Sequence, residues 1–440
     1  MKKLYIETQG CQMNKSDSER IAGILSHFGY IETDIEKEAD LLIINTCSIR
    51  QLAADKAYSK LGVWGKWKKT RPQLKIGICG CVAQQDKEIV RKKAPYVDLV
   101  FGTHNIYELP SLIKQIENDE KVCAITSTPV TCDQNDFKII RKDGVNAWIP
   151  IIEGCNNFCT YCVVPFTRGR ERSRLPEEII KEAKNIIKDG YKEITLLGQN
   201  VDSYGKDLKN PDITLANLLR ELNKLEGEFR IRFVTSYPSD ITDDLINAVD
   251  ECDKVCKYFH IPMQSGNSRI LKEMNRHYTK EQYYEIVDKI RKRFPDVTIT
   301  SDFIAGFPGE TEEEFEDTLK AIDELELDYS NTAAYSPRAF TKAGKMTDLF
   351  LSEEVKSKRL ERLNEKNREV CLRSNKKFIG KILDVLVESK TEKGGNITLN
   401  SRAENNKIVH FQDSAKNIGD FAKVKVTKAQ TWCLYGEPVE

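Results

Sequence analysis

Residues 154–162 read GCNNFCTYC and place Cys155, Cys159 and Cys162 in a C-x3-C-x2-C run. Three thiolates on one tight loop can hold three irons of a cubane, because soft thiolate ligands suit iron–sulfur clusters. The run has no fourth cysteine, so one iron would keep an open position for an outside molecule. Gly154 removes a side chain where backbone N–H groups would approach the cluster sulfurs. The loop therefore predicts a catalytic iron–sulfur cluster.

Three other interpretations of this loop are a zinc knuckle, an electron-carrying cluster and three ordinary buried thiols. Zinc requires a fourth ligand, and no His or Cys lies close downstream. In an electron carrier, the open iron position left by the missing fourth ligand would serve no purpose. Buried thiols do not require this spacing. The chain holds thirteen cysteines, an odd number that argues against a disulfide framework.

The start of the chain, MKKLYIETQG, lacks the apolar core of a signal peptide. No apolar run approaches the about 18 residues of a membrane span. We therefore expect a soluble protein of the cytoplasm with no membrane partner, where metal or redox chemistry is favoured over disulfides.

Strand and helix signals alternate after the cysteine loop. A helix is expected from Pro176 to a stop before Gly190, and Thr311 with Glu314 forms a capping box for another. A long charged helix follows over 352–375. Repeated βα units over about 230 residues predict a barrel or part-barrel with its chemistry at the carboxyl ends of the strands. Its strands are expected at 193–197, 231–235, 257–261, 297–304 and 329–335.

The first third of the chain also alternates strands and helices. Short β-branched runs at 3–7, 40–45 and 75–79 predict a mostly parallel α/β sandwich. Ser16 with Glu19 resembles a capping box that opens a helix ending near Gly29. Ligands gather beyond the carboxyl ends of parallel strands, and one cysteine follows each of the three strands, namely Cys11, Cys47 and Cys81.

The last part of the chain changes pattern. Apolar and polar residues alternate in four short runs, at 382–387, 396–401, 408–411 and 421–426, which predicts a small antiparallel β-barrel. The expected organisation is α/β and multidomain: an N-terminal domain over 1–117, a linker over 118–140, a central barrel domain over 141–371 and a C-terminal barrel domain over 372–440.

The formal charge of zero conceals a segregation of charge. Arg50–Lys93 holds twelve Lys and Arg against three acidic residues, with Trp64 and Trp67 among them. Such a block is typical either of a surface for an anionic polymer or of a solvated lysine-rich helix. Glu310–Asp328 holds ten acidic residues against one lysine and is expected to be an exposed helix face. Directly after the cysteine loop, TRGRERSR adds four arginines that could hold an RNA backbone: Arg168, Arg170, Arg172 and Arg174.

The cysteine loop followed by a βα part-barrel resembles the radical S-adenosylmethionine (SAM) superfamily, and the flanking sequences resemble its methylthiotransferases. The likeness spans nearly the whole chain, in ETQGCQMNKSDSE, LLIINTCSIR, GICGCVAQ, CNNFCTYCVVPFTRGRERSR, LLGQNVDSYG, TSYPSDI, HIPMQSGNSRILKEMNR and DFIAGFPGET. The resemblance implies two [4Fe–4S] clusters, one catalytic and one auxiliary, with SAM as a cofactor. In this superfamily the open iron binds the amine and carboxylate of SAM, whose reductive cleavage yields a 5′-deoxyadenosyl radical.

The resemblance also implies roles for particular residues. The auxiliary cluster would bind Cys11, Cys47 and Cys81; Cys81 is preferred over Cys79 because it lies past the strand. SAM would lie near Gln199, Asn200, Gln264, Ser265, Asp302 and Gly306. SPRAFTKAG (336–344) departs from the SPRPGTPA common in the family, which puts a cofactor contact by this loop in doubt. The other cysteines are expected to be structural: Cys123, Cys132, Cys252, Cys256, Cys371 and Cys433.

The C-terminal barrel resembles a TRAM domain, an RNA-binding module, in the version of the tRNA branch known as MiaB. Its segment SRAENNKIVHF (401–411) offers Arg402, Asn405, Asn406 and Lys407 to phosphates and base edges. The motifs GCQMN and NTCSIR resemble those of enzymes that methylthiolate carbon 2 of isopentenyl-adenosine at tRNA position 37.

Three alternatives to this reaction are the threonylcarbamoyl-adenosine branch, the branch that modifies a ribosomal-protein aspartate, and an RNA-binding protein with structural clusters. The expected partners are the anticodon stem-loop of tRNA and an electron donor such as flavodoxin or ferredoxin, and the chain is expected to be a monomer.

Overall fold

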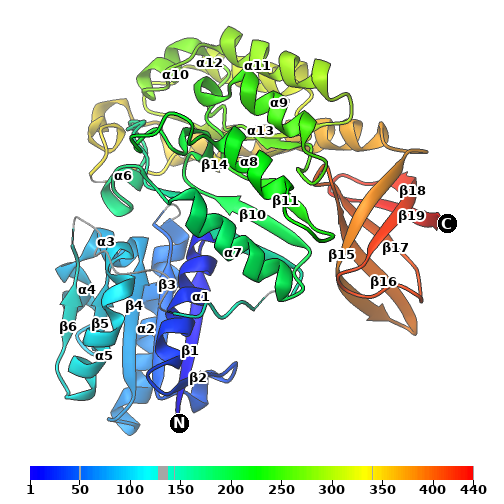
Figure 1. The fold of residues 1–440 in the computed structure, drawn as a ribbon. Helices are drawn as coiled ribbons and strands as arrows, with labels where there is room; N and C mark the ends of the chain where they lie inside the picture. The colour runs from blue at the N-terminus through cyan, green and yellow to red at the C-terminus, as the bar shows by residue number, and fades with distance from the viewer. Residues whose placement is uncertain (49–50, 127–136, 143, 339, 440) are drawn as a thin grey trace. The chain divides into compact units, whose positions relative to one another are not determined.

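The computed structural model describes residues 1–48, 51–126, 137–142, 144–338 and 340–439, with the backbone alone for 51–53, 88 and 396. The chain divides into two compact units (Figure 1). Unit 1 consists of Met1–Lys142, Glu153–Asn156 and Cys162–Glu171, and unit 2 of Asp143–Ile152, Asn157–Tyr161 and Arg172–Glu440. Among the described residues, no helix has the length and the apolar character needed to cross a membrane.

Unit 1 is built on a parallel six-stranded sheet in the order β2-β1-β3-β4-β5-β6. Both faces of the sheet are buried, because Leu41 and Ile43 join one core cluster while Leu42 and Ile44 join the other. The strands are β1 Lys2–Gln9, β2 Tyr30–Glu32, β3 Leu41–Thr46, β4 Lys75–Gly80, β5 Leu99–Phe101 and β6 Val122–Ala124. The predicted N-terminal α/β sandwich is confirmed.

Helices cover both faces of this sheet. The helices α1 and α5 pack on one core cluster, and α2, α3 and α4 pack on the other. Their bounds are α1 Gln12–Ser26, α2 Gln51–Thr70, α3 Cys81–Asp86, α4 Glu88–Lys93 and α5 Leu109–Glu117, and the short α6 Val164–Thr167 follows the cysteine loop.

Two local predictions in unit 1 are wrong. The helix α1 begins at Gln12, and its N-cap is Cys11, whose backbone N–H donates to Oδ1 of Asn14 at 3.3 Å in a capping box. Ser16 and Glu19 instead lie buried inside the helix. The expected linker 118–140 contains β6, which pairs with β5. A three-residue strand is too short to display an alternating pattern, so sequence could not separate it from a connector.

Unit 2 contains the predicted part-barrel. Two three-stranded parallel sheets, β11-β10-β7 and β12-β13-β14, are joined through a parallel bridge between Ile231 and Val255. The strands are β7 Asn146–Pro150, β10 Glu193–Leu197, β11 Arg230–Phe233, β12 Tyr258–His260, β13 Thr298–Ala305 and β14 Tyr329–Ala334, and a short ladder joins β8 Ile152–Glu153 to β9 Arg172–Ser173.

The helices of unit 2 follow the strands in turn. Pro176 opens the first, the box of Thr311 and Glu314 caps α12, and Ser352 caps α13, as the sequence predicted for the first two. Their bounds are α7 Pro176–Lys188, α8 Leu215–Asn223, α9 Asp243–Glu251, α10 Ser268–Glu273, α11 Lys280–Arg293, α12 Glu312–Glu324 and α13 Glu353–Lys376. The helix α13 runs across the expected domain boundary at 371/372.

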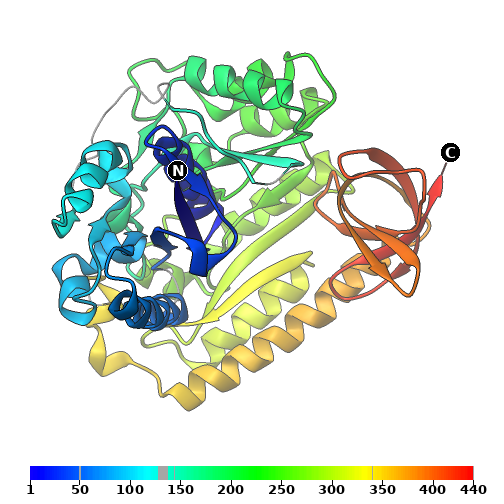
Figure 2. The same cartoon turned by 90° about the horizontal axis from the view of Figure 1, so that it is seen from below.

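The C-terminal segment forms a closed five-stranded barrel in the order β15-β16-β17-β19-β18, seen as a ring of orange and red strands in Figure 2. Four of the strands were expected, and the closing strand β19 was missed. The bounds are β15 Ile382–Lys393, β16 Asn396–Ala403, β17 Ile408–Phe411, β18 Phe421–Ala429 and β19 Leu434–Val439.

Buried ion pairs fasten this barrel to the part-barrel within unit 2. Arg232 on β11 binds both carboxylate oxygens of Glu193 on β10, at 3.0 and 2.9 Å. The same guanidinium donates to the backbone oxygen of Glu404 at 3.1 Å. Lys407 forms a second buried pair, with Asp328, at 2.7 Å. The barrel is therefore held by charges whose partners lie far away in sequence.

Replacing Arg232 with Met is expected to destabilise the protein by about 3–5 kcal/mol, because Glu193 would remain buried without its counter-charge. Urea unfolding of the full chain measures the loss. The double variant Arg232→Met, Glu193→Leu removes both charges and should recover part of the stability. A single variant as stable as the parent would show that the pair does not hold the two strands.

Candidate metal centres

Unit 1 brings Cys11, Cys47 and Cys81 together at the carboxyl edge of its sheet. Cys11 follows β1 and precedes α1, Cys47 follows β3, and Cys81 is the first residue of α3 after β4. The thiol of Cys47 lies within hydrogen-bonding distance of both other thiols. The structure thus gathers three thiols that are separated by 36 and 34 positions in sequence, as their placement at strand ends predicted.

Buried amide side chains hold these strand ends in register. Asn14 donates to Asn45 Oδ1 at 3.0 Å, and Asn45 in turn donates to the Asn14 backbone oxygen at 2.8 Å and to Ser18 Oγ at 3.0 Å. A side chain at Gly80 would have its Cβ 2.4 Å from Asn45 Oδ1, and φ there is +86°. Only glycine therefore fits between the amide frame and Cys81.

The electrostatics of this set favour the thiolate, the form of cysteine that binds metals, at Cys11 and Cys81. The hydrogen bonds with Cys47 lower the pKa of the Cys11 thiol to about 6 and that of Cys81 to about 7, and the buried Arg168 adds to both effects. The same hydrogen bonds raise the pKa of Cys47. Thiols that share protons beside a cation fit an anionic iron–sulfur cluster.

Cys79 lies two residues before Cys81 but has a different environment. It is part of β4, with 1% of its surface exposed, and packs in the hydrophobic core of the sheet. Burial raises the pKa of its thiol well above the usual range. This placement supports Cys81 as the ligand and Cys79 as a core residue.

Arg168 was expected to contact RNA, and the structure contradicts that expectation. Its side chain is 3% exposed, and its Nη2 binds Asp17 Oδ2, also buried, at 2.6 Å. The sequence analysis assigned all four arginines of TRGRERSR to an anionic backbone, whereas the first of them is buried in unit 1, where its charge acts on the thiols of Cys11 and Cys81. Arg168 is therefore placed to stabilise thiolates and is not available to a phosphate.

The loop 154–162 is where the chain passes between the two units, so its two parts are described separately. In unit 1, Cys155 follows Gly154, whose φ is +82° and whose hypothetical Cβ would lie 2.1 Å from the Arg170 backbone oxygen. The Cys155 N–H donates to the Gly169 oxygen at 3.1 Å. The Val164 N–H donates to the Cys162 sulfur at 3.4 Å. Glycine and a backbone donor at a sulfur both suit cluster ligation.

In unit 2, the middle part of this loop is tied to the end of α10. The Thr160 N–H donates to the Met274 oxygen at 3.0 Å, and its Oγ1 donates to the Glu273 oxygen at 2.9 Å. Arg276, two residues further along, places Nη1 3.6 Å from the Cys159 sulfur. No three Cys, His, Asp or Glu side chains of the described residues surround a single ion; each thiolate of a cluster binds a different iron.

Three of the residues expected to bind SAM come together at the carboxyl ends of β12 and β13. Gln264 accepts and donates backbone hydrogen bonds with Ile304 and Asp302, and its φ is +75°. The Asp302 carboxylate accepts a hydrogen bond from Asn331 at 2.9 Å and faces His260 at 3.4 Å. Gly306, with φ +74°, directly follows β13. These groups lie at the strand ends where chemistry was predicted.

The pKa of Asp302 lies below its usual value, although burial alone would raise it, because His260 and Asn331 favour the carboxylate. Two other expected SAM residues are not accessible: the Ser265 side chain is fully buried against Thr318, and Asn200 is 2% exposed and donates to Asp240. Gln199 lies half-buried after β10.

Most of the barrel residues that were expected to bind RNA form contacts within the protein instead. Lys407 is 7% exposed and binds Asp328 and Ser374. Asn405 is equally buried and donates to the Asp296 backbone oxygen at 3.3 Å. These two expectations are wrong, because the turn that carries them packs on the part-barrel. Asn406 and Arg402 are half-buried, and Arg402 pairs with Glu388.

The remaining arginines of the tract differ in exposure. Arg170 is exposed, Arg172 is half-buried, and Arg174 pairs with Glu182 at 2.8 Å. In the basic block Arg50–Lys93, Trp64 is fully buried and donates to Glu36, so it offers no stacking surface to a base. The position of Arg50 lies outside the described residues.

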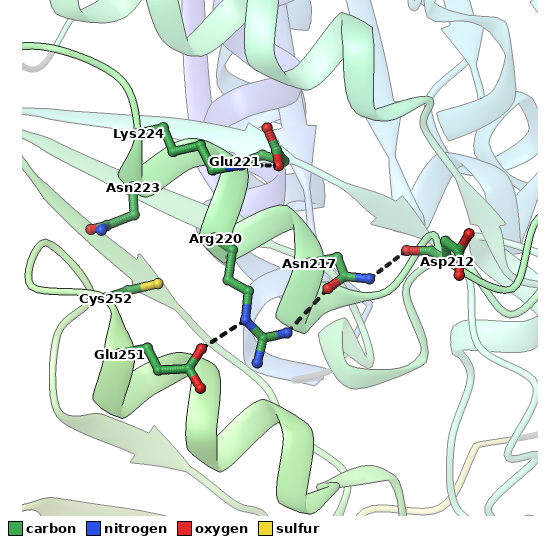
Figure 3. A pocket seen from close by; sticks show the side chains of 8 residues that line it. All are labelled: Asp212, Asn217, Arg220, Glu221, Asn223, Lys224, Glu251 and Cys252. Carbon is green, nitrogen blue, oxygen red and sulfur yellow. Dashed lines mark hydrogen bonds and ion pairs between the residues drawn. The ribbon is translucent and has the colours of Figure 1, made fainter.

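Some expected residues have no role at the metal centres. Cys256 and Cys371 are buried, and the position of Cys132 lies outside the described residues. Cys252 lines a polar pocket of about 540 Å³ between α8 and α9, together with Arg220 and Glu251 (Figure 3). None of the residues expected to bind a cluster, SAM or RNA lines this pocket.

Sequence reasoning missed several residues that shape the sites. Glu310 was assigned to an exposed acidic face, but it is 3% exposed and accepts the Gly306 N–H at 2.8 Å. Burial raises the pKa of Glu310 to about 7, against the opposing effects of Gly306 and Arg359. Asp17 and Arg276 were also missed, because both act through partners more than one hundred positions away.

Comparison with known proteins assigns each part of the chain. Residues 149–322 match the Radical SAM superfamily, residues 376–439 match the TRAM domain, and residues 3–102 match Uncharacterized protein family UPF0004. The fold resembles that of TsrM, a radical SAM methyltransferase from Kitasatospora setae solved with cobalamin and a [4Fe-4S] cluster. The TM-score is 0.57 at 14% identity, with 78% of this chain and 77% of that one covered.

Curated relatives match over nearly the full length. The chain is 47% identical to a protein of Thermoanaerobacter pseudethanolicus over 99% of its length and 92% of the relative's, and 47% identical to one of Clostridium botulinum over 99% and 96%. A protein of Acetivibrio thermocellus is 46% identical over 100% and 91%. All three are named tRNA-2-methylthio-N(6)-dimethylallyladenosine synthase. This chain therefore belongs to that family of radical SAM methylthiotransferases.

Proposed function

We propose that this chain converts N6-isopentenyladenosine at position 37 of tRNA into its 2-methylthio derivative, with sulfur from an auxiliary cluster and the methyl group from SAM. The names of relatives 46–47% identical along the chain support this substrate. The observation that carries the proposal is the second thiol set, Cys11, Cys47 and Cys81, because a radical SAM centre by itself needs only one set.

The enzyme is a radical SAM methylthiotransferase, and its cofactors are SAM and [4Fe–4S] clusters. When bound, these groups supply the radical chemistry and the sulfur, because an aromatic C–H is too weak an acid for side-chain base catalysis. We assign Cys155, Cys159 and Cys162 to the catalytic cluster and the second thiol set to the auxiliary one.

The residues at the carboxyl ends of β12 and β13, with Asn331 of β14, are suited to hold the nucleoside part of SAM. The Asp302 carboxylate, a third exposed, can accept hydrogen bonds from ribose hydroxyls while Asn331 fixes its orientation. Gly306 lets the backbone approach the adenine closely, and Gln264 adds an amide beside it. These assignments follow the placement of the residues at the strand ends.

The outer face of β18 is suited to the RNA backbone. Lys423, Lys425 and Lys428 are exposed along this strand, while Ala422 and Val424 point into the barrel. Within the described part of the chain, none of the three lysines pairs with a carboxylate, so their charges remain available to phosphates. We infer that this face, rather than the buried Lys407 and Asn405, contacts tRNA.

We further propose that the partner RNA is the anticodon stem-loop, that flavodoxin or ferredoxin supplies electrons, and that the chain acts as a cytoplasmic monomer. Two other functions compete with the first proposal. One is methylthiolation of threonylcarbamoyl-adenosine, and the other is RNA binding with purely structural clusters.

Deleting the gene is expected to abolish 2-methylthio-isopentenyl-adenosine and to let isopentenyl-adenosine accumulate, as measured by nucleoside mass spectrometry of cellular tRNA. The parent gene should restore the modified nucleoside. The triple variant Cys155→Ala, Cys159→Ala, Cys162→Ala should fold and bind tRNA without restoring it. Loss of the 2-methylthio-threonylcarbamoyl nucleoside instead would move the enzyme to the sister branch, and an unfolded triple variant would favour structural clusters.

Anaerobically reconstituted protein is expected to hold about eight irons per chain, the content of two [4Fe–4S] clusters. Cys81→Ala should lower this to about four, because the auxiliary cluster loses a ligand. The matched variant Cys79→Ala should keep about eight, since that thiol lies in the core. Iron assay and electron paramagnetic resonance (EPR) read both. The reverse pattern would transfer the ligand role to Cys79.

Reversing the charge of Lys423, Lys425 and Lys428 to Glu is expected to weaken tRNA binding and to reduce its salt dependence, because each lost phosphate contact lowers the slope by about 0.7–0.9. Filter binding at several salt concentrations measures both quantities. The matched variant changes Lys181, Lys184 and Lys188 of α7 to Glu, which alters net charge equally. Equal losses in the two variants would contradict a specific role for β18.

A further inference from the structure

Arg276 lies directly after α10 and is 9% exposed. Its guanidinium is held on several sides within unit 2. The Nε donates to the Tyr278 hydroxyl at 2.7 Å, and Nη2 donates to the Pro262 backbone oxygen at 2.6 Å. The rings of Tyr237 and Tyr278 lie 4.4 and 5.0 Å from the guanidinium carbon. These contacts fix the plane of the group.

The remaining terminal nitrogen is directed at a predicted cluster ligand. Arg276 Nη1 lies 3.6 Å from the Cys159 sulfur. The backbone hydrogen bond from Thr160 to Met274 ties the cysteine loop to the same end of α10. The hydrogen bonds of the guanidinium and the hydrogen bond of the loop to Met274 therefore both maintain the contact between Arg276 and Cys159.

Among the residues that the structure describes, no carboxylate forms an ion pair with Arg276, although the guanidinium contributes to the lowered pKa of Asp302. Other buried arginines of unit 2 form such a pair: Arg232 binds Glu193, and Arg359 binds Glu310. An arginine stays protonated in a protein, and a buried charge is costly unless an opposite charge lies near. Of the hydrogen-bond partners of Arg276 among the described residues, which are Tyr278, Pro262 and Cys159, only the sulfur of Cys159 becomes anionic as a metal ligand.

We propose that Arg276 is a positioning residue of the catalytic centre, whose guanidinium donates an N–H···S hydrogen bond to the Cys159 thiolate and serves as the buried counter-ion of the anionic cluster. The inference rests on the proposed ligand role of Cys159. Hydrogen bonds to cluster sulfurs and nearby charge are what set the potential of such clusters. A fixed positive charge stabilises the reduced form more, because that form carries one more negative charge.

The test is an EPR-monitored redox titration of the full chain carrying Cys11→Ala, Cys47→Ala and Cys81→Ala, so that one cluster remains. In this background Arg276→Met should lower the equilibrium constant for reduction about tenfold, which is about 59 mV for one electron. Arg276→Lys, which keeps the charge, should fall between. The matched control Arg220→Met removes an arginine at the polar pocket of Figure 3 and should leave the potential unchanged.

Thermal unfolding of the same proteins, with and without the cluster, separates this role from simple packing. Arg276→Met should destabilise the cluster-loaded protein more than the cluster-free one, because only the loaded protein also loses the attraction between the guanidinium and the cluster. A variant that fails to fold in both states, or that loads iron with an unchanged potential, would overturn the proposal. Failure of the parent background to bind iron would instead contradict the proposed ligand role of Cys159.

Discussion

A thiolate inside a protein must be stabilised by hydrogen-bond donors and cations, and the ends of the strands are where this chain can supply them. Cys79 and Cys81 show how strongly the pKa of a thiol depends on its position relative to the strand end. Cys79 lies in the dry interior of β4, where burial raises the pKa of its thiol. Two residues later the strand has ended, and the pKa of Cys81 falls to about 7 beside Cys47 and Arg168. A step of two residues separates a core thiol from a thiol whose lowered pKa suits it to bind a metal.

Buried cations recur beside the sulfur groups, but their partners differ. In unit 1, Arg168 lies between Asp17 and the thiols, so it carries its own counter-charge whether or not a cluster is bound. In unit 2, Arg276 forms no ion pair with a carboxylate among the described residues, and the sulfur of Cys159 is the hydrogen-bond partner that can become its counter-charge. The first arrangement is stable before cluster insertion, while the second gains its full electrostatic balance only with the cluster present.

Much of this architecture could be predicted from sequence because it depends on patterns among neighbouring residues. The strand at 193–197 and the cap at Thr311 were placed as observed, since periodicity and capping need only neighbouring residues. The six cysteines could be proposed from their spacing, their strand-end positions and the family resemblance. The strand β6 was missed because three residues carry too little periodicity.

The residues that sequence misplaced share one physical property, which is that their partners are distant. Lys407 and Asn405 look like an exposed polar turn, yet their partners Asp328 and Asp296 lie 79 and 109 positions away. Arg168 and Asp17 are separated by 151 positions. No local pattern can distinguish a lysine that meets a phosphate from one that meets a buried carboxylate. Burial of the partner decides the matter, and burial depends on the tertiary structure.

The docking of the C-terminal barrel follows from the same chemistry. The turn 402–407 has the residue types that bind RNA, but its backbone oxygens accept hydrogen bonds from Arg230 and Arg232, and its lysine is neutralised by Asp328. A buried lysine that is already paired with a carboxylate gains no free energy from binding a phosphate. Breaking the existing ion pair costs as much free energy as the new contact provides. The exposed lysines of β18 have no such partner among the described residues, so a phosphate there replaces only water and counter-ions. We therefore expect this barrel to contact RNA through β18, whose exposed lysines form no ion pair with a carboxylate among the described residues.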